Sequence, residues 1–446
     1  MLRWFEAFYS VDAVCISDAR AGVFIAGDEY VVAIDGKTDR RIGLWADDCY
    51  PVAFCTDAAA GKLYCLSYPP LVTAIDQATD SLLANVPLDY YSETACLNTV
   101  DRKVYVAGAE YGLRTIAVLD GVGDSLLTEI AVDGEPTLLA YNPTDDVLFA
   151  AGGSYDIQAI DGKADSVIDY FQVNELPTGL VYNDAQHKLY SLGKNGTVAV
   201  IDPSVHGVNT RIQVGAGLGC FALNSSGSRF YCGSPRHDSV YVIDCVQEGM
   251  VCAIPVAGPP VALCYDSPHD RLYSASSADS GLSVIDCARN MVVATVPVAA
   301  QYLYYDSTSD AVYCLGENKL TVVDGQTGAI VRTLASGSYP AGIASAPGWT
   351  RVYAGCGDNS YLSVVRKSAG PAEMAVQAAP EPQATVVRRS LRFAGKAQAV
   401  LFDMSGRWVD NLHPGPNDVS GLAPGVYFLR EAQAQAQAVR KVIITR

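Results

Sequence analysis

A short apolar run that ends in aspartate returns along most of this chain at intervals of 38 to 44 residues. Eight copies end in an acid, namely Asp35, Asp76, Asp120, Asp161, Asp202, Asp244, Asp286 and Asp324. A ninth copy ends in Arg366 instead. Such a period indicates an array of one small structural unit, because a unit this short buries its apolar face only by stacking on its neighbours.

Two further landmarks keep the same period. One is a step of a basic residue, an apolar residue and a tyrosine, with tyrosines at Tyr64, Tyr105, Tyr190, Tyr231, Tyr273 and Tyr353. The other is an apolar run that ends in Asn98, Asn142, Asn183, Asn224, Asp266 or Asp306. Each unit therefore divides into four short runs rich in β-branched and aromatic residues, separated by Gly, Asn, Asp and Ser, which is the pattern of strands and turns.

Four strands per unit, repeated without a helical period, predict an all-β chain that forms a single large β-propeller over residues 1–366. Counting third strands predicts nine four-stranded blades. Eight blades, with one weak unit outside the ring, is the alternative, because propellers typically have four to eight. The last unit ends after its third strand, at residues 362–365. We expect residues 2–9 to supply its fourth strand and so close the ring.

The end of the chain has a different character. Residues 367–384 are rich in Ala and Pro and are expected to form an extended linker. Residues 385–446 carry nine basic and four acidic residues, against 22 and 44 in the residues before them. Alternating runs at 391–393, 399–402, 425–429 and 439–445 predict a small antiparallel β-sandwich as a separate C-terminal domain.

Composition limits the partners. The chain has 31 Lys and Arg against 48 Asp and Glu, for a formal net charge of −17. This balance argues against nucleic acid or an anionic membrane as the main partner. No apolar stretch is long enough to span a membrane as a helix, and Glu6 falls where a signal peptide would have its apolar centre. We expect a monomer.

The repeated Lys-Leu-Tyr and Val-Ile-Asp steps resemble the YVTN-type β-propeller repeats of bacterial and archaeal surface and periplasmic proteins. The resemblance covers residues 10–366. It implies the propeller fold, but such propellers serve binding, scaffolding and occasionally catalysis.

The tail is similar to the type A C-terminal sorting domain of the type IX secretion system. The matching segments are residues 401–407, 422–428 and 440–446. The resemblance implies recognition of the tail by the secretion machinery and a secreted or cell-surface protein. The residues carried over as the sorting signal are Asp403, Gly406, Arg407, Gly425, Tyr427 and Lys441.

The loops that lead into the first strands are expected to line one mouth of a central channel. They are acidic and aromatic, and their candidate ligand-binding residues are Asp47, Asp48, Tyr50, Asp89, Tyr90, Tyr91, Glu93, Asp133, Glu135, Glu175, Tyr302 and Tyr339. Aromatic rings supply contact area and acids supply polarity, which suits a cationic, sugar-like or peptide ligand. The alternative is a solvated loop rim without a ligand.

The repeated residues have structural interpretations that we favour over functional ones. The acid after each apolar run is expected to accept hydrogen bonds from the backbone of its own turn; calcium binding is the alternative, although the full calcium-loop pattern is missing. The Asn and Asp that end first strands are likewise expected to form turns. The repeated tyrosines are expected to pack between blades, with their hydroxyls reaching an edge.

Thirteen cysteines and five histidines include no Cys-x-x-Cys pair and no zinc-ligand spacing. Eight of the cysteines fall on expected strands and are interpreted as small buried apolar residues: Cys15, Cys55, Cys65, Cys96, Cys232, Cys264, Cys314 and Cys356. A disulfide between Cys245 and Cys252, across one hairpin, is the alternative for that pair. We predict no metal and no cofactor.

No nucleophile elbow, phosphate loop or dinucleotide fingerprint occurs, and the histidines fall at turns or strand edges, not beside a repeated acid or Ser. The leading hypothesis is therefore an exported, non-enzymatic propeller that binds a protein, peptide or glycan. Its rival is a hydrolase or lactonase-type enzyme with a metal held by acidic channel-mouth loops. A third possibility is an internal scaffold.

Overall fold

The computed structural model describes residues 2–6, 13–17, 22–27, 30–36, 38, 40–46, 50–79, 81–108, 114–205, 207–276, 281–345, 349–356, 361–367, 385–387, 390–393, 399–403, 407–413, 415–423, 425–431 and 439–444. The chain divides into two compact units, Met1–Val376 and Gln377–Arg446. The division falls inside the stretch expected to be a linker.

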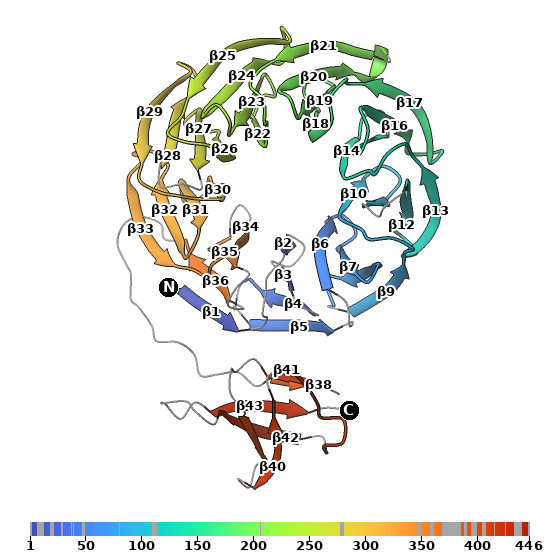
Figure 1. Ribbon diagram of the computed structural model, residues 1–446, viewed down its shortest axis with the longest axis vertical. Coiled ribbons are helices and arrows are strands. Elements are labelled where there is room, and N and C mark those ends of the chain that lie inside the picture. Colours follow the sequence, from blue (N-terminus) through green and yellow to red (C-terminus); the bar gives the residue numbers. More distant parts are fainter. Residues whose placement is uncertain are drawn as a thin grey trace. The chain divides into compact units, whose positions relative to one another are not determined.

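The first unit holds nine four-stranded antiparallel sheets arranged as the blades of a ring (Figure 1). Blades one to three are β2 (Ala13–Ser17), β3 (Gly22–Gly27), β4 (Tyr30–Asp35), β5 (Arg40–Ala46); β6 (Tyr50–Asp57), β7 (Lys62–Tyr68), β8 (Leu71–Asp76), β9 (Ser81–Pro87); and β10 (Thr94–Asn98), β11 (Lys103–Ala107), β12 (Thr115–Asp120), β13 (Ser125–Ala131). Blades four to six are β14 (Leu138–Asn142), β15 (Val147–Ala151), β16 (Asp156–Asp161), β17 (Ser166–Gln172); β18 (Pro177–Asn183), β19 (Lys188–Gly193), β20 (Thr197–Asp202), β21 (Gly207–Gln213); and β22 (Cys220–Leu223), β23 (Arg229–Ser234), β24 (Ser239–Asp244), β25 (Gly249–Pro255). Blades seven to nine are β26 (Pro260–Asp266), β27 (Arg271–Ser276), β28 (Leu282–Asp286), β29 (Met291–Val296); β30 (Tyr302–Asp306), β31 (Ala311–Gly316), β32 (Lys319–Asp324), β33 (Ile330–Ala335); and β34 (Pro340–Ala344), β35 (Arg351–Cys356), β36 (Tyr361–Arg366), β1 (Leu2–Glu6).

The ring closes as the sequence predicts. β1 pairs antiparallel with β36, with Leu2 opposite Val365 and Glu6 opposite Tyr361, so the N-terminal strand completes the ninth blade. Figure 1 shows β1 beside β36 on the outside of the ring. The predicted count of nine blades is confirmed, and the alternative of eight is not needed. Residues 7–9, also expected in this strand, lie outside the described residues.

Burial explains why each unit needs its neighbours. The second and third strands are almost wholly buried; in β7, for example, every residue from Leu63 to Ser67 is buried. Fourth strands lie on the outside and expose most of their residues, as in β13. Alternating apolar side chains of the middle strands face both neighbouring blades, and this arrangement buries both faces of each sheet.

Where a blade carries the repeated basic residue and tyrosine, these side chains can join it to the next blade. Tyr105 is fully buried, and its hydroxyl donates to the carbonyl oxygen of Gly162 at 3.2 Å. The Lys103 ammonium donates to the same carbonyl at 2.8 Å and pairs with Asp165 at 2.7 Å. At the closing joint, Tyr353 donates to Gly36 at 3.3 Å. The predicted packing role of the tyrosines is confirmed.

The acids that end third strands are turn residues, as predicted. The Asp76 carboxylate accepts from the backbone N–H groups of Ala78 and Thr79 at 2.8 and 2.7 Å. Hydrogen bonds from the backbone N–H of Gln247 lower the pKa of Asp244 below its usual value. The pKa values of the corresponding Asp202, Asp286 and Asp324 are lowered in the same way, by hydrogen bonds within their own turns.

The disulfide alternative between Cys245 and Cys252 is wrong, because both are free thiols. Cys245 is fully buried and packs in the same core cluster as Tyr190. Cys245 follows the third-strand acid Asp244. At this position other blades have a glycine whose carbonyl oxygen accepts a hydrogen bond from the tyrosine hydroxyl. Burial raises the pKa of Cys245, so the thiol stays protonated at that joint.

The second unit contains a five-stranded sheet in the order β37 (Thr385–Val387), β43 (Val439–Ile444), β42 (Gly425–Glu431), β39 (Ala399–Asp403) and β40 (Trp408–Leu412). A two-stranded sheet is formed by β38 (Ser390–Phe393) and β41 (Gly415–Asp418). Both sheets contribute to one small core, which includes Leu391, Leu401 and Leu429. The expectation of a purely antiparallel sandwich is corrected in one detail, because β37 pairs parallel with β43.

Helix is almost absent from the described residues, where it amounts to the single 3-10 turn η1 (Pro203–Val205). In the same part of the chain, no helix has the length and apolar character needed to cross a membrane.

Candidate functional site

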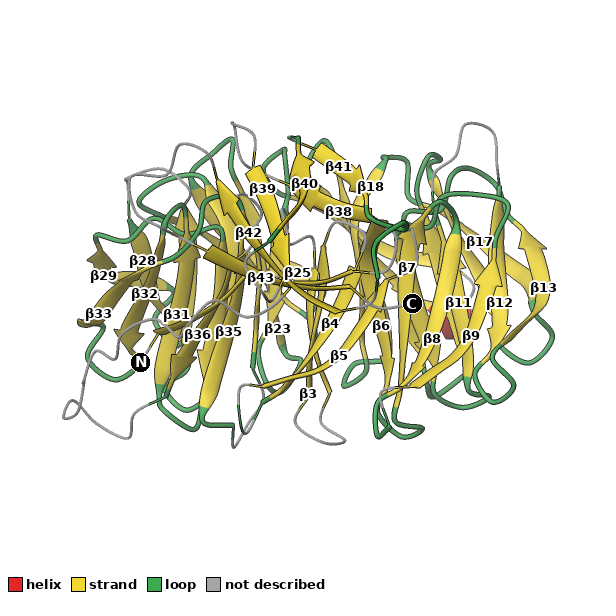
Figure 2. Ribbon diagram, turned by 90° about the horizontal axis from the view of Figure 1, so that it is seen from below, coloured by secondary structure: helices red, strands yellow, loops and turns green. Residues whose placement is uncertain are grey.

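The loops of the first unit gather at two ends of the strands (Figure 2). One end, which we call the loop face, carries the connections from a fourth strand to the next first strand and from second to third strands. The other, which we call the turn face, carries the tight turns between first and second and between third and fourth strands. All candidate ligand-binding residues within the described part of the chain belong to the loop face. Asp47 and Asp48 lie outside the described residues.

Three exposed tyrosines meet on the loop face at blades two and three. The rings of Tyr68 and Tyr91 are stacked with centroids 4.8 Å apart, and their hydroxyls lie 3.4 Å apart. The Tyr50 ring lies 6.3 Å from that of Tyr68, with which it is paired across β6 and β7. Relative exposures of 44%, 47% and 38% for Tyr50, Tyr68 and Tyr91 leave aromatic surface open to solvent. We call these three residues the tyrosine cluster.

The loop that carries Tyr91 is fixed at both ends and bears two acids. The N–H of Leu88 donates to Pro70 of blade two at 3.1 Å, and that of Glu93 donates to Ala107 of blade three at 2.9 Å. Asp89 and Glu93 are both exposed. The loop therefore presents an aromatic ring between two carboxylates on a backbone that is held in place.

Tyr90 does not belong to a ligand surface, contrary to the sequence-based expectation. It is 1% exposed; its hydroxyl donates to Val106 at 2.9 Å and accepts from the N–H of Ala117 at 2.8 Å. Burial raises the pKa of Tyr90 to about 12, so the phenol remains a donor. Adjacent residues of an extended segment point in opposite directions, and here Tyr90 points inward while Tyr91 points to solvent.

The acids expected on blades four and five differ in how they are held: Asp133 is fixed through its backbone and its side chain is exposed, whereas the Glu175 carboxylate is hydrogen-bonded within blade five. The backbone of Asp133 exchanges two hydrogen bonds with the Gln158 side chain, at 3.0 and 2.7 Å. Glu135 is half-buried. The Glu175 carboxylate accepts from the N–H of Asn195 at 2.9 Å and from the Thr197 hydroxyl, and so ties the loop before β18 to that before β20.

Tyr302 and Tyr339 are exposed on the loop face but are separate from the tyrosine cluster. Tyr302 begins β30 in blade eight and is 39% exposed. Tyr339 precedes β34 in blade nine, is 70% exposed and has a φ of 52°. They are solvent-exposed residues on blades eight and nine, whereas the cluster lies on blades two and three.

Sequence reasoning missed Tyr68 and a repeated bulge of the first strands. Tyr68 ends a second strand, and the landmarks of the repeat gave no reason to single it out. In four blades the residue after a proline is bulged out of the ladder, at Val52, Thr178, Val261 and Ala341. Val52 and Val261 are 42% and 37% exposed. A Pro-x-Ala/Gly signal at the start of each of these strands marks these bulges.

Two histidines lie closer to other functional groups than the sequence suggested. Ser234 Oγ is 2.9 Å from His237 Nδ1 and also 2.6 Å from the carbonyl oxygen of Ala216. The hydroxyl of Ser234 has one proton, which it donates to the Ala216 carbonyl oxygen. His237 Nδ1 is therefore the protonated donor to Oγ, and it cannot act as the base that would activate the Ser234 hydroxyl. The second, His269, lies beside two acids on the turn face.

No family model matches this chain, and no curated protein is similar to it in sequence. Solved structures resemble it in fold. Dihydro-heme d1 dehydrogenase NirN, solved in complex with DHE, is 14% identical with a TM-score of 0.58, over 73% of this chain and 75% of that one. The computationally designed Ika8 protein is 15% identical with a TM-score of 0.54, over 70% and 95% of the two chains. At this identity the likeness shows the β-propeller fold alone.

Proposed function

We propose that this chain is an exported β-propeller of the YVTN type that binds a basic peptide segment of a partner through its loop face, without catalysing a reaction. The observation that carries the proposal is the tyrosine cluster, in which exposed rings from β6, β7 and the loop before β10 converge. Exposed aromatic groups on a fixed backbone supply contact area at little cost in conformational entropy.

Charge favours a cationic ligand. Asp89 and Glu93 flank the cluster, and the chain as a whole carries a formal net charge of −17. A lysine or arginine side chain over a tyrosine face gains a cation–π contact, and the neighbouring carboxylates attract the same charge. A neutral glycan would use the rings but not the acids.

The proposed route of export is the type IX secretion system, with the second unit as its sorting domain. Three similar segments support this proposal, and they fall on neighbouring strands: Asp403 of β39 is opposite Tyr427 of β42, and Lys441 of β43 is opposite Phe428. The Tyr427 hydroxyl donates to Ala423 at 2.7 Å, and Arg407 is exposed. Gly425 begins β42, and Gly406 lies outside the described residues.

A peptide and glycan array probed with the full chain tests the binding proposal. We expect hits among Lys- and Arg-rich peptides, with affinity reduced about tenfold or more by Tyr91→Ala. The matched control is Tyr339→Ala, which removes an exposed tyrosine of the same face outside the cluster and should leave binding unchanged. Equal affinity of the Tyr91 variant and the wild type, or hits confined to neutral glycans, would refute the proposal.

Fractionation of the producing cells tests export separately. The proposal predicts the protein in the medium or on the cell surface, and a protein found only in the cytosol would leave the internal scaffold as the better hypothesis. The metal-dependent enzyme remains the rival. Within the described residues, the one group of side chains close enough to hold a metal lies on the turn face rather than among the acidic loops where that rival places it.

A further inference from the structure

Neighbouring blades meet on the turn face through a repeated pair of positions. One is the last residue of a first strand, and the other lies near the end of the turn after the first strand of the next blade. At the joint of blades three and four, Asn98 donates to Asp146 at 2.7 Å. At the joint of blades five and six, Asn183 donates to the carbonyl oxygen of Gly227 at 2.8 Å. A neutral amide therefore serves where the first strand ends in asparagine.

Where the first strand ends in aspartate, a cation joins the pair. Asp57 is 2% exposed and lies 3.3 Å from the guanidinium of Arg102. Asp306 is 1% exposed and lies 2.7 Å from the ammonium of Lys367. A buried carboxylate needs such a partner, because an uncompensated charge in the protein interior is strongly destabilising.

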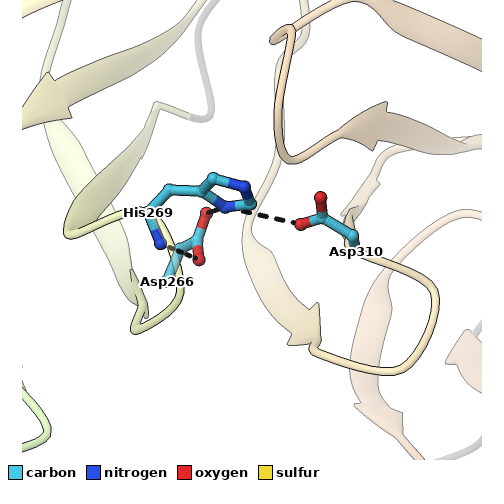
Figure 3. Close-up of side chains that lie close together, drawn as sticks. All are labelled: Asp266, His269 and Asp310. Atoms are coloured by element: carbon cyan, nitrogen blue, oxygen red, sulfur yellow. Dashed lines mark hydrogen bonds and ion pairs between the residues drawn. The ribbon is translucent and has the colours of Figure 1, made fainter.

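The joint of blades seven and eight departs from this pattern because both positions are acids. Asp266 ends β26 and is fully buried, and Asp310 ends the turn after β30. His269, from the turn after β26, places Nδ1 2.9 Å from Asp266 Oδ2 and 3.5 Å from Asp310 Oδ1 (Figure 3). The Tyr305 hydroxyl donates to Asp310 at 2.9 Å and holds that carboxylate in place. Two carboxylates thus share one imidazole. Even with a protonated ring, one of the two negative charges has no positive counter-charge among these three residues.

We propose that Asp266, His269 and Asp310 bind a divalent metal ion. One donor atom from each residue falls within a group no wider than 4.8 Å, and His269 presents its ring nitrogen between the two carboxylates. Two donors that are each about 2.1 Å from one tetrahedral ion lie about 3.4 Å apart. The observed separations therefore need only small movements around an ion. A dication neutralises both carboxylates, which the imidazole alone does not.

The donor set selects the class of ion. One imidazole nitrogen with two carboxylate oxygens suits Zn²⁺ or Mn²⁺ better than Ca²⁺, which prefers six to eight oxygen ligands. Three protein ligands leave at least one position for water. Asp310 and His269 are partly exposed, with side-chain exposures of 40% and 24%, so solvent and the ion reach the site from the turn face. This site is on the opposite face from the tyrosine cluster and is independent of the proposed function.

Calorimetric titration of the full chain, stripped with a chelator and then mixed with ZnCl₂ or MnCl₂, tests the site. We expect one ion per chain for the wild type. Asp266→Asn should weaken metal binding by about 100-fold or more. Removing a metal ligand should lower the affinity at least as much as removing a residue that only hydrogen-bonds to a ligand. This variant installs the residue that ends three other first strands, so the ring should still fold. His269→Gln should change the position and intensity of the visible absorption of bound Co²⁺, because an oxygen ligand replaces the imidazole nitrogen.

The control is Asp146→Asn, which removes the acid that corresponds to Asp310 at a joint with a single carboxylate. Its metal binding should equal that of the wild type. The proposal is overturned if the wild type binds no stoichiometric ion, or if Asp266→Asn and Asp146→Asn behave alike. Circular dichroism of each variant before titration confirms that a loss of binding is not a loss of fold.

Discussion

Single residues in the repeat have roles set by burial and by one or two hydrogen bonds. Tyr90 and Tyr91 are adjacent, yet one is locked into the core by two hydrogen bonds to the backbone and the other is open to solvent. The environment of two cysteines is likewise set by their position in the repeat. Cys245 and Cys287 both follow a third-strand acid, and each packs in one core cluster with a tyrosine from the preceding blade.

Buried cysteines should be unreactive in the native protein. Burial raises the pKa of Cys55 and Cys220 to about 12 and that of Cys96 and Cys264 to about 11, so almost no thiolate exists near neutral pH. Labelling with a thiol reagent at pH 8 should be slow for these residues and fast after denaturation. Rapid native labelling of Cys55 or Cys220 would contradict their assigned burial.

The blade joint is the element on which the stability of the first unit depends. Lys103 and Tyr105 reach Gly162 and Asp165, which lie about 60 residues further on, in the turn of the next blade. The side chains that make this contact are mostly buried, with exposures of 13% for Lys103 and 15% for Asp165. Exposed ion pairs within a single turn, such as Arg289 with Asp286, contribute little by comparison.

Lys103→Met should therefore lower the free energy of unfolding by about 1–3 kcal/mol, because it leaves the Asp165 carboxylate and the Gly162 carbonyl without their charged donor. Arg289→Met, the matched control, loses a pair in which the arginine side chain is 73% exposed and should cost under about 0.5 kcal/mol. Urea denaturation measures both. Similar losses for the two variants would contradict the importance of the joint.

The turns between third and fourth strands predict a pH dependence. The pKa of Asp244 is lowered in the folded state, so its contribution to stability is fully present above the unfolded value of about 3.9 and is lost as pH falls through the folded pKa. The wild type should be more stable than Asp244→Asn at pH 6, and the difference should shrink below about pH 4. Thermal denaturation across this range provides the test; a difference that is constant from pH 6 to pH 3 would exclude the carboxylate as its cause.

At the scale of the whole molecule, the repeat predicted the blades because the turn chemistry of each unit is local. The acid that ends a third strand bonds to the backbone within three residues of itself, as Asp76 does, so its role follows from sequence. The Asn or Asp that ends a first strand also forms its own turn, but its contact with the next blade, as from Asn98 to Asp146, does not follow from sequence. Counting units also predicted nine blades and the missing strand that residues 2–6 supply.

The candidate sites were harder to predict, because their members come from different segments. Tyr68 joins Tyr50 and Tyr91 only when blade two folds and packs on the loop before β10. Asp310 lies near His269 across the joint between two blades, so the spacing of residues within a single unit does not predict that contact. Within the second unit, the predicted runs do not include three of the seven strands, β37, β40 and β41.

The central claim is a ring of nine blades closed by the N-terminal strand, and a designed disulfide across the closing pair tests it most directly. Arg3 and Val364 are directly opposite in the β1–β36 ladder, where the Cβ atoms of facing residues lie about 4.5–5.5 Å apart. In the double variant Arg3→Cys/Val364→Cys, mild oxidation should join these two residues within one chain, as seen by peptide mass mapping and a monomeric band on a non-reducing gel. If both new thiols stay free, or bridge only between chains, β1 does not complete the ninth blade.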